Sequence, residues 1–163
     1  MTDSPFPPLN EVNIGGIGDF PIDAVLFCCT MNAVRSAMAE GLAKLMFGTS
    51  IYIDSAGVRQ GEPDYLMIEV MKELSINAQT HRSKTFEDLS DSSFDLIITL
   101  SPEAHHHALE YTRTMGCEVE FWHTMDPTII EGSRDARLDA YRQIRNQLQQ
   151  KLQTRLAPLI NRS

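Results

Sequence analysis

From Ala24 onward, short apolar segments alternate with segments whose apolar residues recur every three or four positions. The apolar segments predict four strands, at residues 24–28, 51–53, 94–100 and 119–122. The periodic segments predict helices at residues 35–47, from Pro63 onward, at 102–114 and from about Ser133, the expected N-cap. Strands that alternate with helices form a parallel sheet covered on both faces. The pattern therefore predicts an α/β fold, built as a three-layer sandwich.

The same periodicity predicts which helix faces are buried. They carry Met38, Leu42 and the pair Leu45/Met46 on the first helix, Met67, Val70, Met71 and Leu74 on the second, and Leu138, Tyr141, Ile144, Leu148 and Leu152 on the last. The basic residues of the last helix are interleaved with glutamines, and we predict that they form a solvated outer face: Arg134, Arg137, Arg142, Arg145, Lys151 and Arg155.

A length of 163 residues fits a single domain, but the first residues differ in composition from the rest. Four of the eight prolines and three of the nine glycines precede Asp23. Such a composition is typical of irregular chain. We therefore predict an arm or mobile extension over residues 1–22 and the folded domain over residues 23–163.

Charge and cysteine content limit the partners and the compartment. Fourteen basic and 22 acidic residues give a net charge of -8 and a pI near 5.0, which disfavours nucleic acid and anionic membranes as partners. No apolar run approaches the roughly 18 residues that span a bilayer. A signal peptide begins with basic residues, and no basic residue precedes Arg35. Three cysteines are too few for a disulfide framework. We expect a cytoplasmic protein that binds neither nucleic acid nor membrane.

The turn between the first strand and the first helix carries the clearest chemical signal. Cys29 leaves the strand, five residues form a loop, and Arg35 opens the helix. Loop amides and the helix dipole form a site for a tetrahedral oxyanion and favour the nucleophilic thiolate of Cys29. The Arg35 guanidinium matches two phosphate oxygens. The alternative is a structural thiol beside a surface charge, but the position between strand and helix favours catalysis.

A thiolate that attacks a phosphate ester needs an acid for the leaving oxygen. Asp126 and Pro127 follow the fourth strand, at the same end of the predicted sheet, and Pro127 stiffens that loop. We expect Asp126 to protonate the leaving group and then to deprotonate the water that attacks the phosphocysteine. Taken alone, Asp-Pro is an ordinary turn pair.

Residues 25–41, which include this turn, resemble the phosphate loop and first helix of the low-molecular-weight protein tyrosine phosphatases. Three further segments resemble that family, namely residues 54–57, residues 81–84 and Asp126-Pro127. The resemblance covers about residues 23–156 and implies a four-stranded parallel sheet flanked by helices in a phosphatase-like catalytic domain. It implies these roles: Cys29 as nucleophile, Arg35 as phosphate clamp and Asp126 as general acid and base.

The same resemblance implies a set of binding and supporting residues. The phosphoryl group would be bound by the loop residues Thr30, Met31, Asn32, Ala33, Val34 and Arg35. The loop and the thiolate would be held by Asn32, Ser36, Ser55 and His81; for His81 the alternative is an ordinary exposed polar side chain. The implied substrates are phosphotyrosine in proteins or small aryl phosphate esters, and the implied inhibitors are phosphate, vanadate and sulfate. The implied mechanism needs neither a metal nor a cofactor.

Three features depart from the family pattern. Met31 stands where the family usually has glycine, and we expect its side chain to rim the pocket. Val34 stands where a second loop cysteine often traps an oxidised nucleophile, and Cys28 on the strand should point the other way. Thr128 and Ile129 follow the acid loop, where the family often has aromatic residues.

Two other functions remain as alternatives. Thioredoxin-coupled arsenate reductases resemble these phosphatases but use two further cysteines after the third strand, and residues 100–109 contain none. Cys117 stands alone, and a thiol relay needs a resolving partner. A catalytically silent phosphate-binding module is the other alternative, because Met31 departs from the loop pattern.

Three consecutive histidines, His105 to His107, suggest a metal site at first sight. Consecutive residues on a helix point in different directions, so they cannot chelate one ion well. We therefore predict a solvated helix face and no metal site.

Overall fold

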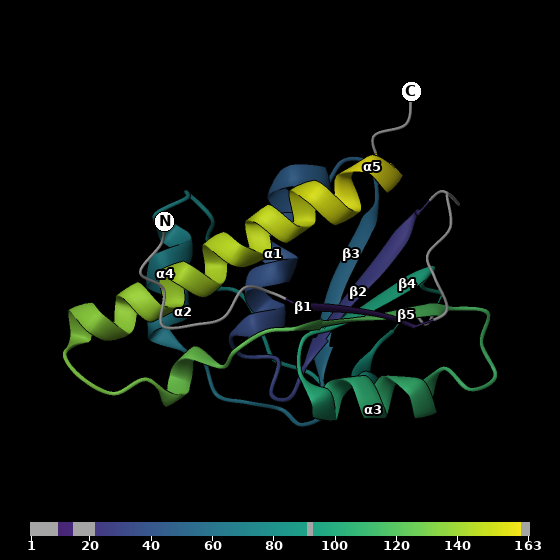
Figure 1. Cartoon of the computed structure of the whole chain (residues 1–163), viewed down its shortest axis with the longest axis horizontal. Coiled ribbons are helices and arrows are strands. Elements are labelled where there is room, and N and C mark those ends of the chain that lie inside the picture. Colours follow the sequence, from purple (N-terminus) through teal and green to yellow (C-terminus); the bar gives the residue numbers. More distant parts are fainter. Residues whose placement is uncertain (1–9, 15–21, 91–92, 161–163) are drawn as a thin grey trace.

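The computed structural model describes residues 10–14, 22–90 and 93–160 of the chain. Its central sheet has five strands in the order β1-β5-β4-β2-β3 (Figure 1). Four of them are parallel: β2 (Ala24–Cys29), β3 (Tyr52–Gly57), β4 (Leu96–Thr99) and β5 (Glu118–His123). The fifth, β1 (Asn10–Ile14), pairs antiparallel with β5 at one edge.

The four predicted strands and their parallel arrangement are confirmed, whereas β1 was not predicted. It lies inside the segment that the sequence analysis treated as an extension, residues 1–22. Pairing with the edge strand β5 supplies its ladder of hydrogen bonds. The rest of that extension, residues 1–9 and 15–21, lies outside the described residues, and its mobility stays a prediction.

Helices cover both faces of the sheet, which confirms the three-layer sandwich (Figure 1). On one face pack α1 (Arg35–Phe47), α2 (Tyr65–Lys72), α4 (Arg134–Lys151) and α5 (Ala157–Ile160), with the π-helical turn η3 (Leu152–Leu156) between the last two. On the other face pack α3 (Pro102–Tyr111) and the short 3-10 helix η1 (Phe86–Asp88). No helix in the described part of the chain is long and apolar enough to cross a membrane.

The strand register brings the chemically important ends together. Cys29 pairs with Gly57 of β3, and Cys28 pairs with Thr99 of β4. The carboxyl ends of these three strands therefore lie side by side at the same end of the sheet. Alternation along β2 places Cys29 in the apolar cluster beneath α1 and Cys28 in the cluster beneath α3. The expected opposite orientation of Cys28 is therefore confirmed.

Most of the predicted helix faces are buried, and the predicted N-cap is present. All five apolar residues named on the last helix are buried, and the Ser133 hydroxyl accepts a hydrogen bond from the Ala136 amide. Leu45 is the exception on α1, because its side chain is 58% exposed and Met46 packs against the core instead. The prediction was therefore wrong for Leu45 alone: of the adjacent residues Leu45 and Met46, only Met46 lies on the buried face of α1.

The predicted solvated face of the last helix is wrong at two of its six basic residues. Arg145 is 7% exposed and donates to the Val70 carbonyl and to Glu73, both at 2.7 Å. Arg155 forms two hydrogen bonds, at 2.8 and 3.1 Å, with the fully buried carboxylate of Glu120 on β5. Glu120 also accepts from the Trp122 indole at 3.0 Å. Both guanidinium groups turn inward because they bind carboxylates on other elements of the fold. The periodicity of the helix sequence cannot predict such partners.

The Glu120–Arg155 pair generates the first prediction. Replacing Arg155 by methionine keeps the apolar stem but leaves a buried carboxylate without its cation, so the free energy of unfolding should fall by about 3 kcal/mol. Urea unfolding followed by circular dichroism measures this loss. Arg113→Met, which removes an exposed pair with Glu110, is the matched control and should cost less than about 1 kcal/mol. Equal losses in the two variants would contradict the structural role of the buried pair.

Candidate active site

The segment from Cys29 to Arg35 forms a loop at the N-terminus of α1, as the sequence predicts. Side chains of Asp64, Ser101 and Ser133 cap α2, α3 and α4, whereas no side chain caps the first turn of α1. The amide groups at the start of a helix carry partial positive charge and lack partners within the helix. This helix end therefore has the properties of an anion-binding site.

The Cys29 sulfur lies at the base of this loop and is 2% exposed as a residue. Its Sγ atom lies 2.9 Å from the Ser36 hydroxyl. It also accepts hydrogen bonds from the amides of Asn32, at 3.3 Å, and Ser36, at 3.4 Å. Donors that converge on a sulfur stabilise its negative charge, so the arrangement suits a thiolate.

Asn32 holds the loop in its conformation. Its backbone φ of 55° lies in the left-handed region, which asparagine tolerates better than most residues. The buried side-chain amide donates to the hydroxyls of Ser36 and Ser55, both at 2.8 Å, and its Oδ1 accepts from the Lys84 amide at 3.0 Å. The His81 Nε2 lies 2.7 Å from the Asn32 carbonyl. The structure thus brings together the four residues that the sequence analysis assigned to loop support.

Glu40 belongs to the same network, and the sequence analysis missed it. Its carboxylate accepts from the Ser55 hydroxyl, and its Oε1 lies 3.9 Å from the Nδ1 of His81. Lys44 lies 2.6 Å from its other oxygen. One signal was available in the sequence, because Glu40 follows Ser36 by four residues and so shares its helix face. A single carboxylate therefore contacts both side chains that hold Asn32 from outside the loop.

Two glycines allow β3 and the segment after it to approach the loop. A Cβ atom at Gly57 would lie 2.8 Å from the Asn32 nitrogen and 2.8 Å from the Arg59 carbonyl oxygen. A Cβ atom at Gly61 would lie 3.0 Å from the Cβ of Met31. A side chain does not fit at Gly57 without a shift of backbone atoms, and at Gly61 it would be tightly packed, so these glycines let the backbone of this segment support the loop.

Arg35 faces the acid loop from the first turn of α1. Its Nη1 donates to the Thr124 carbonyl at 3.0 Å, and its Nη2 lies 4.0 Å from the Oδ2 of Asp126. The side chain is only 11% exposed, and it lines the cavity described below. The Thr124 carbonyl, directly after β5, fixes the orientation of this cation.

Asp126 has one oxygen fixed and one directed toward Arg35. Its Oδ1 accepts from the amide of Thr128, at 3.0 Å, and from the Thr128 hydroxyl, at 2.7 Å. These contacts cap the short 3-10 helix η2 (Pro127–Ile129). The Asp126 side chain remains 37% exposed, so its Oδ2 is available to a ligand and to water.

A small cavity of about 110 Å³ joins the predicted catalytic residues. Its wall consists of Cys29, Met31, Ala33, Val34, Arg35, Asp64, Asp126 and Thr128. The expected place of Met31 at the rim is confirmed, with the residue 40% exposed. Of the loop residues predicted to bind the phosphoryl group, Thr30 and Asn32 do not line this cavity. The Thr30 hydroxyl lies 3.0 Å from that of Ser101 on the α3 side.

Asp64 is a second cavity residue that the sequence analysis missed. Its Oδ1 accepts from the Met67 amide at 2.9 Å, which caps α2, and its Oδ2 accepts from the Tyr141 hydroxyl at 2.8 Å. Burial and this contact raise the pKa of Tyr141. The position of Asp64 before a helix predicts a cap, but its place beside Asp126 depends on the packing of α2 against α4.

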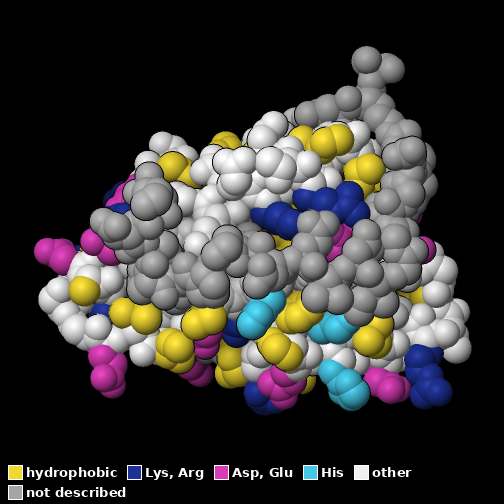
Figure 2. All heavy atoms as spheres, in the orientation of Figure 1, with side chains coloured by type: hydrophobic (Ala, Val, Ile, Leu, Met, Phe, Trp, Pro, Cys, Tyr) yellow, Lys and Arg dark blue, Asp and Glu magenta, His cyan; other side chains and the backbone are white. Residues whose placement is uncertain are grey.

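The three consecutive histidines have separate surroundings. His105 lies 2.9 Å from the Thr99 hydroxyl and stacks on Phe121, whereas His107 packs on Phe86 of η1. Histidine side chains are scattered over the visible face of the molecule rather than gathered in one patch (Figure 2). Among the described residues, no group of three His, Cys, Asp or Glu side chains has a metal-binding arrangement.

The close approach at Gly57 generates a prediction. Gly57→Ala should lower the free energy of unfolding by about 2 kcal/mol, because the new methyl group meets backbone atoms that cannot move freely. It should also weaken phosphate binding, because the new methyl group would displace the backbone nitrogen of Asn32 in the loop. Gly116→Ala is the control, because a Cβ there meets no atom within 4 Å. Calorimetric titration with phosphate and urea unfolding test both effects; unchanged phosphate affinity in Gly57→Ala would argue against backbone support of the loop.

Comparison with known proteins agrees with this geometry. Residues 24–162 match the model of a protein family described as low molecular weight phosphotyrosine protein phosphatase. An arsenate reductase of Halalkalibacterium halodurans is 27% identical over 132 residues, which are 80% of this chain and 92% of that protein.

Solved structures of an arsenate reductase and of a tyrosine phosphatase have the same fold as this chain. An arsenate reductase in its phosphate-binding state is 25% identical, with a TM-score of 0.68 over 84% of this chain and 98% of that one. The tyrosine phosphatase AmsI of Erwinia amylovora is 18% identical, with a TM-score of 0.69 over 94% of this chain and all of that one, which shows the fold alone. Since the family model spans nearly the whole described domain, this chain belongs to the low molecular weight phosphotyrosine protein phosphatase family.

Proposed function

We propose that this protein is a phosphatase that hydrolyses phosphotyrosine or small aryl phosphate monoesters through a phosphocysteine intermediate. The observation that carries the proposal is the cavity in which Cys29, Arg35 and Asp126 meet. A nucleophile, a fixed cation and an acid around one small cavity are the groups that phosphoryl transfer requires. Family membership supports this chemistry, and an arsenate reductase solved in its phosphate-binding state supports the binding of a phosphate-like oxyanion by this fold.

In the first step, the phosphoryl group binds at the amides of the loop and at the Arg35 guanidinium. The Cys29 thiolate attacks phosphorus, and the bond from phosphorus to the leaving oxygen breaks. Asp126 donates its proton from Oδ2 to that oxygen, so an alcohol or phenol leaves. Arg35 and the loop amides stabilise the charge on the phosphoryl oxygens in the transition state.

In the second step, the Asp126 carboxylate accepts a proton from water while the water oxygen attacks the phosphocysteine. The phosphorus–sulfur bond breaks, and Cys29 leaves as a thiolate. The Ser36 hydroxyl and the amides of Asn32 and Ser36 donate to that sulfur, so they stabilise the leaving group. Inorganic phosphate is the product, and neither step needs a metal or a cofactor.

The rim of the cavity suits a flat apolar group above the phosphate. Met31 contributes a flexible thioether to the cavity wall, and thioethers pack well against aromatic rings. Thr128 uses its amide and its hydroxyl to hold Asp126, and Ile129 is exposed. Contact with an aryl ring is therefore assigned to Met31 rather than to the residues after Pro127. Phosphate, vanadate and sulfate are expected to bind competitively at the same loop.

Arsenate reduction is the second candidate, because the relatives named above include arsenate reductases. A thiol relay from Cys29 needs a second reactive thiol within reach. Burial raises the pKa of Cys28 well above its ordinary value, and this thiol lies in the cluster on the opposite face of the sheet. Burial also raises the pKa of Cys117 to about 11. Neither thiol lines the cavity of Cys29, which favours the phosphatase over the reductase.

The nucleophile is tested by Cys29→Ser. This variant should lose p-nitrophenyl phosphate hydrolysis by more than about a thousandfold, because a serine hydroxyl in this loop is a far weaker nucleophile at neutral pH. It should still bind phosphate in calorimetric titration. The wild type should be inhibited competitively by vanadate and should not oxidise reduced thioredoxin when arsenate is added.

Other outcomes of that experiment would indicate a different nucleophile or a different function. Retained hydrolysis in Cys29→Ser would overturn the nucleophile assignment. Phosphate binding without any hydrolysis by the wild type would favour the silent binding module. Thioredoxin oxidation with arsenate that survives in Cys117→Ser but not in Cys29→Ser would establish a reductase with a different relay.

The general acid is tested by Asp126→Asn. Protonation matters most when the leaving oxygen is basic, so phenyl phosphate should lose about a hundredfold in kcat/KM and p-nitrophenyl phosphate clearly less. A series of substituted phenyl phosphates measures this as a steeper dependence on the leaving-group pKa. An equal loss for all esters would remove Asp126 from the acid role and leave it a contact of Arg35.

A further inference from the structure

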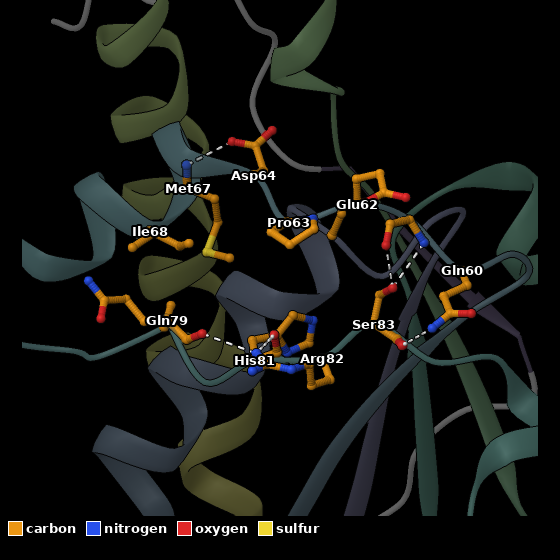
Figure 3. A pocket seen from close by; sticks show the side chains of 13 residues that line it. Gln60, Glu62, Pro63, Asp64, Met67, Ile68, Gln79, His81, Arg82 and Ser83 are labelled. Carbon is orange, nitrogen blue, oxygen red and sulfur yellow. Dashed lines mark hydrogen bonds between the residues drawn. The ribbon is translucent and has the colours of Figure 1, made fainter.

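A second pocket, which we call the flanking pocket, adjoins the catalytic cavity. It has a volume of about 340 Å³ and lies between the loop at residues 60–64, the first turn of α2 and the loop at residues 78–83 (Figure 3). Ala33 and Asp64 line both this pocket and the catalytic cavity. The pocket and the catalytic cavity are therefore neighbours that share these two residues.

The walls of the flanking pocket are fixed by hydrogen bonds between its two loops. The Ser83 hydroxyl donates to the Gly61 carbonyl at 2.6 Å and accepts from the Gly61 amide at 2.9 Å. Gln60 donates from its side chain to the Ser83 carbonyl at 3.2 Å. Figure 3 shows Ser83 between the two loops, joined by these contacts. A pocket with such walls is preformed, so a ligand does not have to order it.

Part of the pocket wall is apolar, and the wall also carries charges of both signs. Pro63, Met67 and Ile68 form one side, with Ala78 opposite. Glu62 and Arg82 are exposed on the two facing loops, and neither forms an ion pair with a described residue.

The rim charges do not select a charged ligand. Arg82 donates from Nη1 to the carbonyls of Gln79, at 3.2 Å, and His81, at 3.1 Å, which holds its side chain at the rim. Asp64 adds a second carboxylate to the lining, although its oxygens already accept from the Met67 amide and the Tyr141 hydroxyl. With two carboxylates and one guanidinium among its Asp, Glu and Arg side chains, the pocket has no net positive charge to attract an anion. The apolar part of the wall then offers contact to an uncharged aliphatic group.

We propose that the flanking pocket binds an aliphatic side chain next to the phosphorylated residue of a protein substrate. This rests on the proposed function and selects phosphoproteins over small esters as the substrate class. A phosphoryl group at Cys29 leaves the rest of its carrier at the rim beside Ala33 and Asp64. A small aryl ester ends at that rim, whereas a polypeptide continues past it and reaches the adjoining pocket.

Matched phosphotyrosine peptides test this assignment. One peptide carries glycine on both sides of the phosphotyrosine, and two others carry leucine on one side only, before or after it. The wild type should hydrolyse one of the leucine peptides with kcat/KM about tenfold above the glycine peptide, which is the usual discrimination by an apolar pocket. Ile68→Gln, which makes the apolar part of the wall polar, should abolish this preference.

Leu66→Gln is the matched control. Leu66 lies on the same helix, is half-buried and packs against the same core, but it does not line the flanking pocket. It should keep the leucine preference, and thermal unfolding of the two variants checks that both are folded. Equal hydrolysis of the three peptides by the wild type, or an equal loss of preference in the two variants, would overturn the proposal.

A binding experiment separates this proposal from the proposed function. The same three peptides with a non-hydrolysable phosphonate in place of the phosphate are titrated calorimetrically into the wild type and Ile68→Gln. A tenfold difference in Kd between leucine and glycine peptides, lost in Ile68→Gln, supports the pocket even if no peptide is hydrolysed. Hydrolysis of p-nitrophenyl phosphate without any leucine preference in kcat/KM or Kd would keep the phosphatase and overturn the pocket.

Discussion

The active-site loop depends on the hydrogen bonds that fix the buried residue Asn32. This residue has a positive φ, and its side chain donates to Ser36 and Ser55 and accepts from the Lys84 amide. Without these contacts a loop of inward amides repels itself, since its partial charges have the same sign. With them, the Asn32 amide and the Ser36 groups converge on the Cys29 sulfur. Charge stabilisation at the sulfur is thus prepared before a substrate arrives.

The parallel sheet places the parts of this arrangement at one edge. The sulfur ends β2, Ser55 lies on β3, and the acid loop follows β5, so segments far apart in the sequence meet where parallel strands end. Gly57 removes the side chain that would keep β3 away from the loop. The net charge of -8 opposes an anion at long range. Close donors and the Arg35 cation must therefore supply the affinity locally.

Local patterns in the sequence predict much of this architecture. The apolar strands, the helix starts and the strand–loop–helix position of Cys29 and Arg35 all follow from residues close together in the chain. What the patterns missed depends on partners far apart: Glu40 meets His81, Asp64 meets Tyr141, and β1 pairs with β5. Arg145 and Arg155 turn inward for the same reason. An edge strand in a segment rich in proline and glycine likewise has no local apolar pattern to reveal it.

The most direct test of the account is to trap the phosphoenzyme. The wild type is mixed with p-nitrophenyl phosphate, quenched in acid within its first turnovers and digested for peptide mass spectrometry. The account predicts a phosphoryl group on Cys29, together with an initial burst of p-nitrophenol. A phosphoryl group on another residue, or steady hydrolysis with neither burst nor adduct, would contradict the claim that this sulfur attacks the substrate.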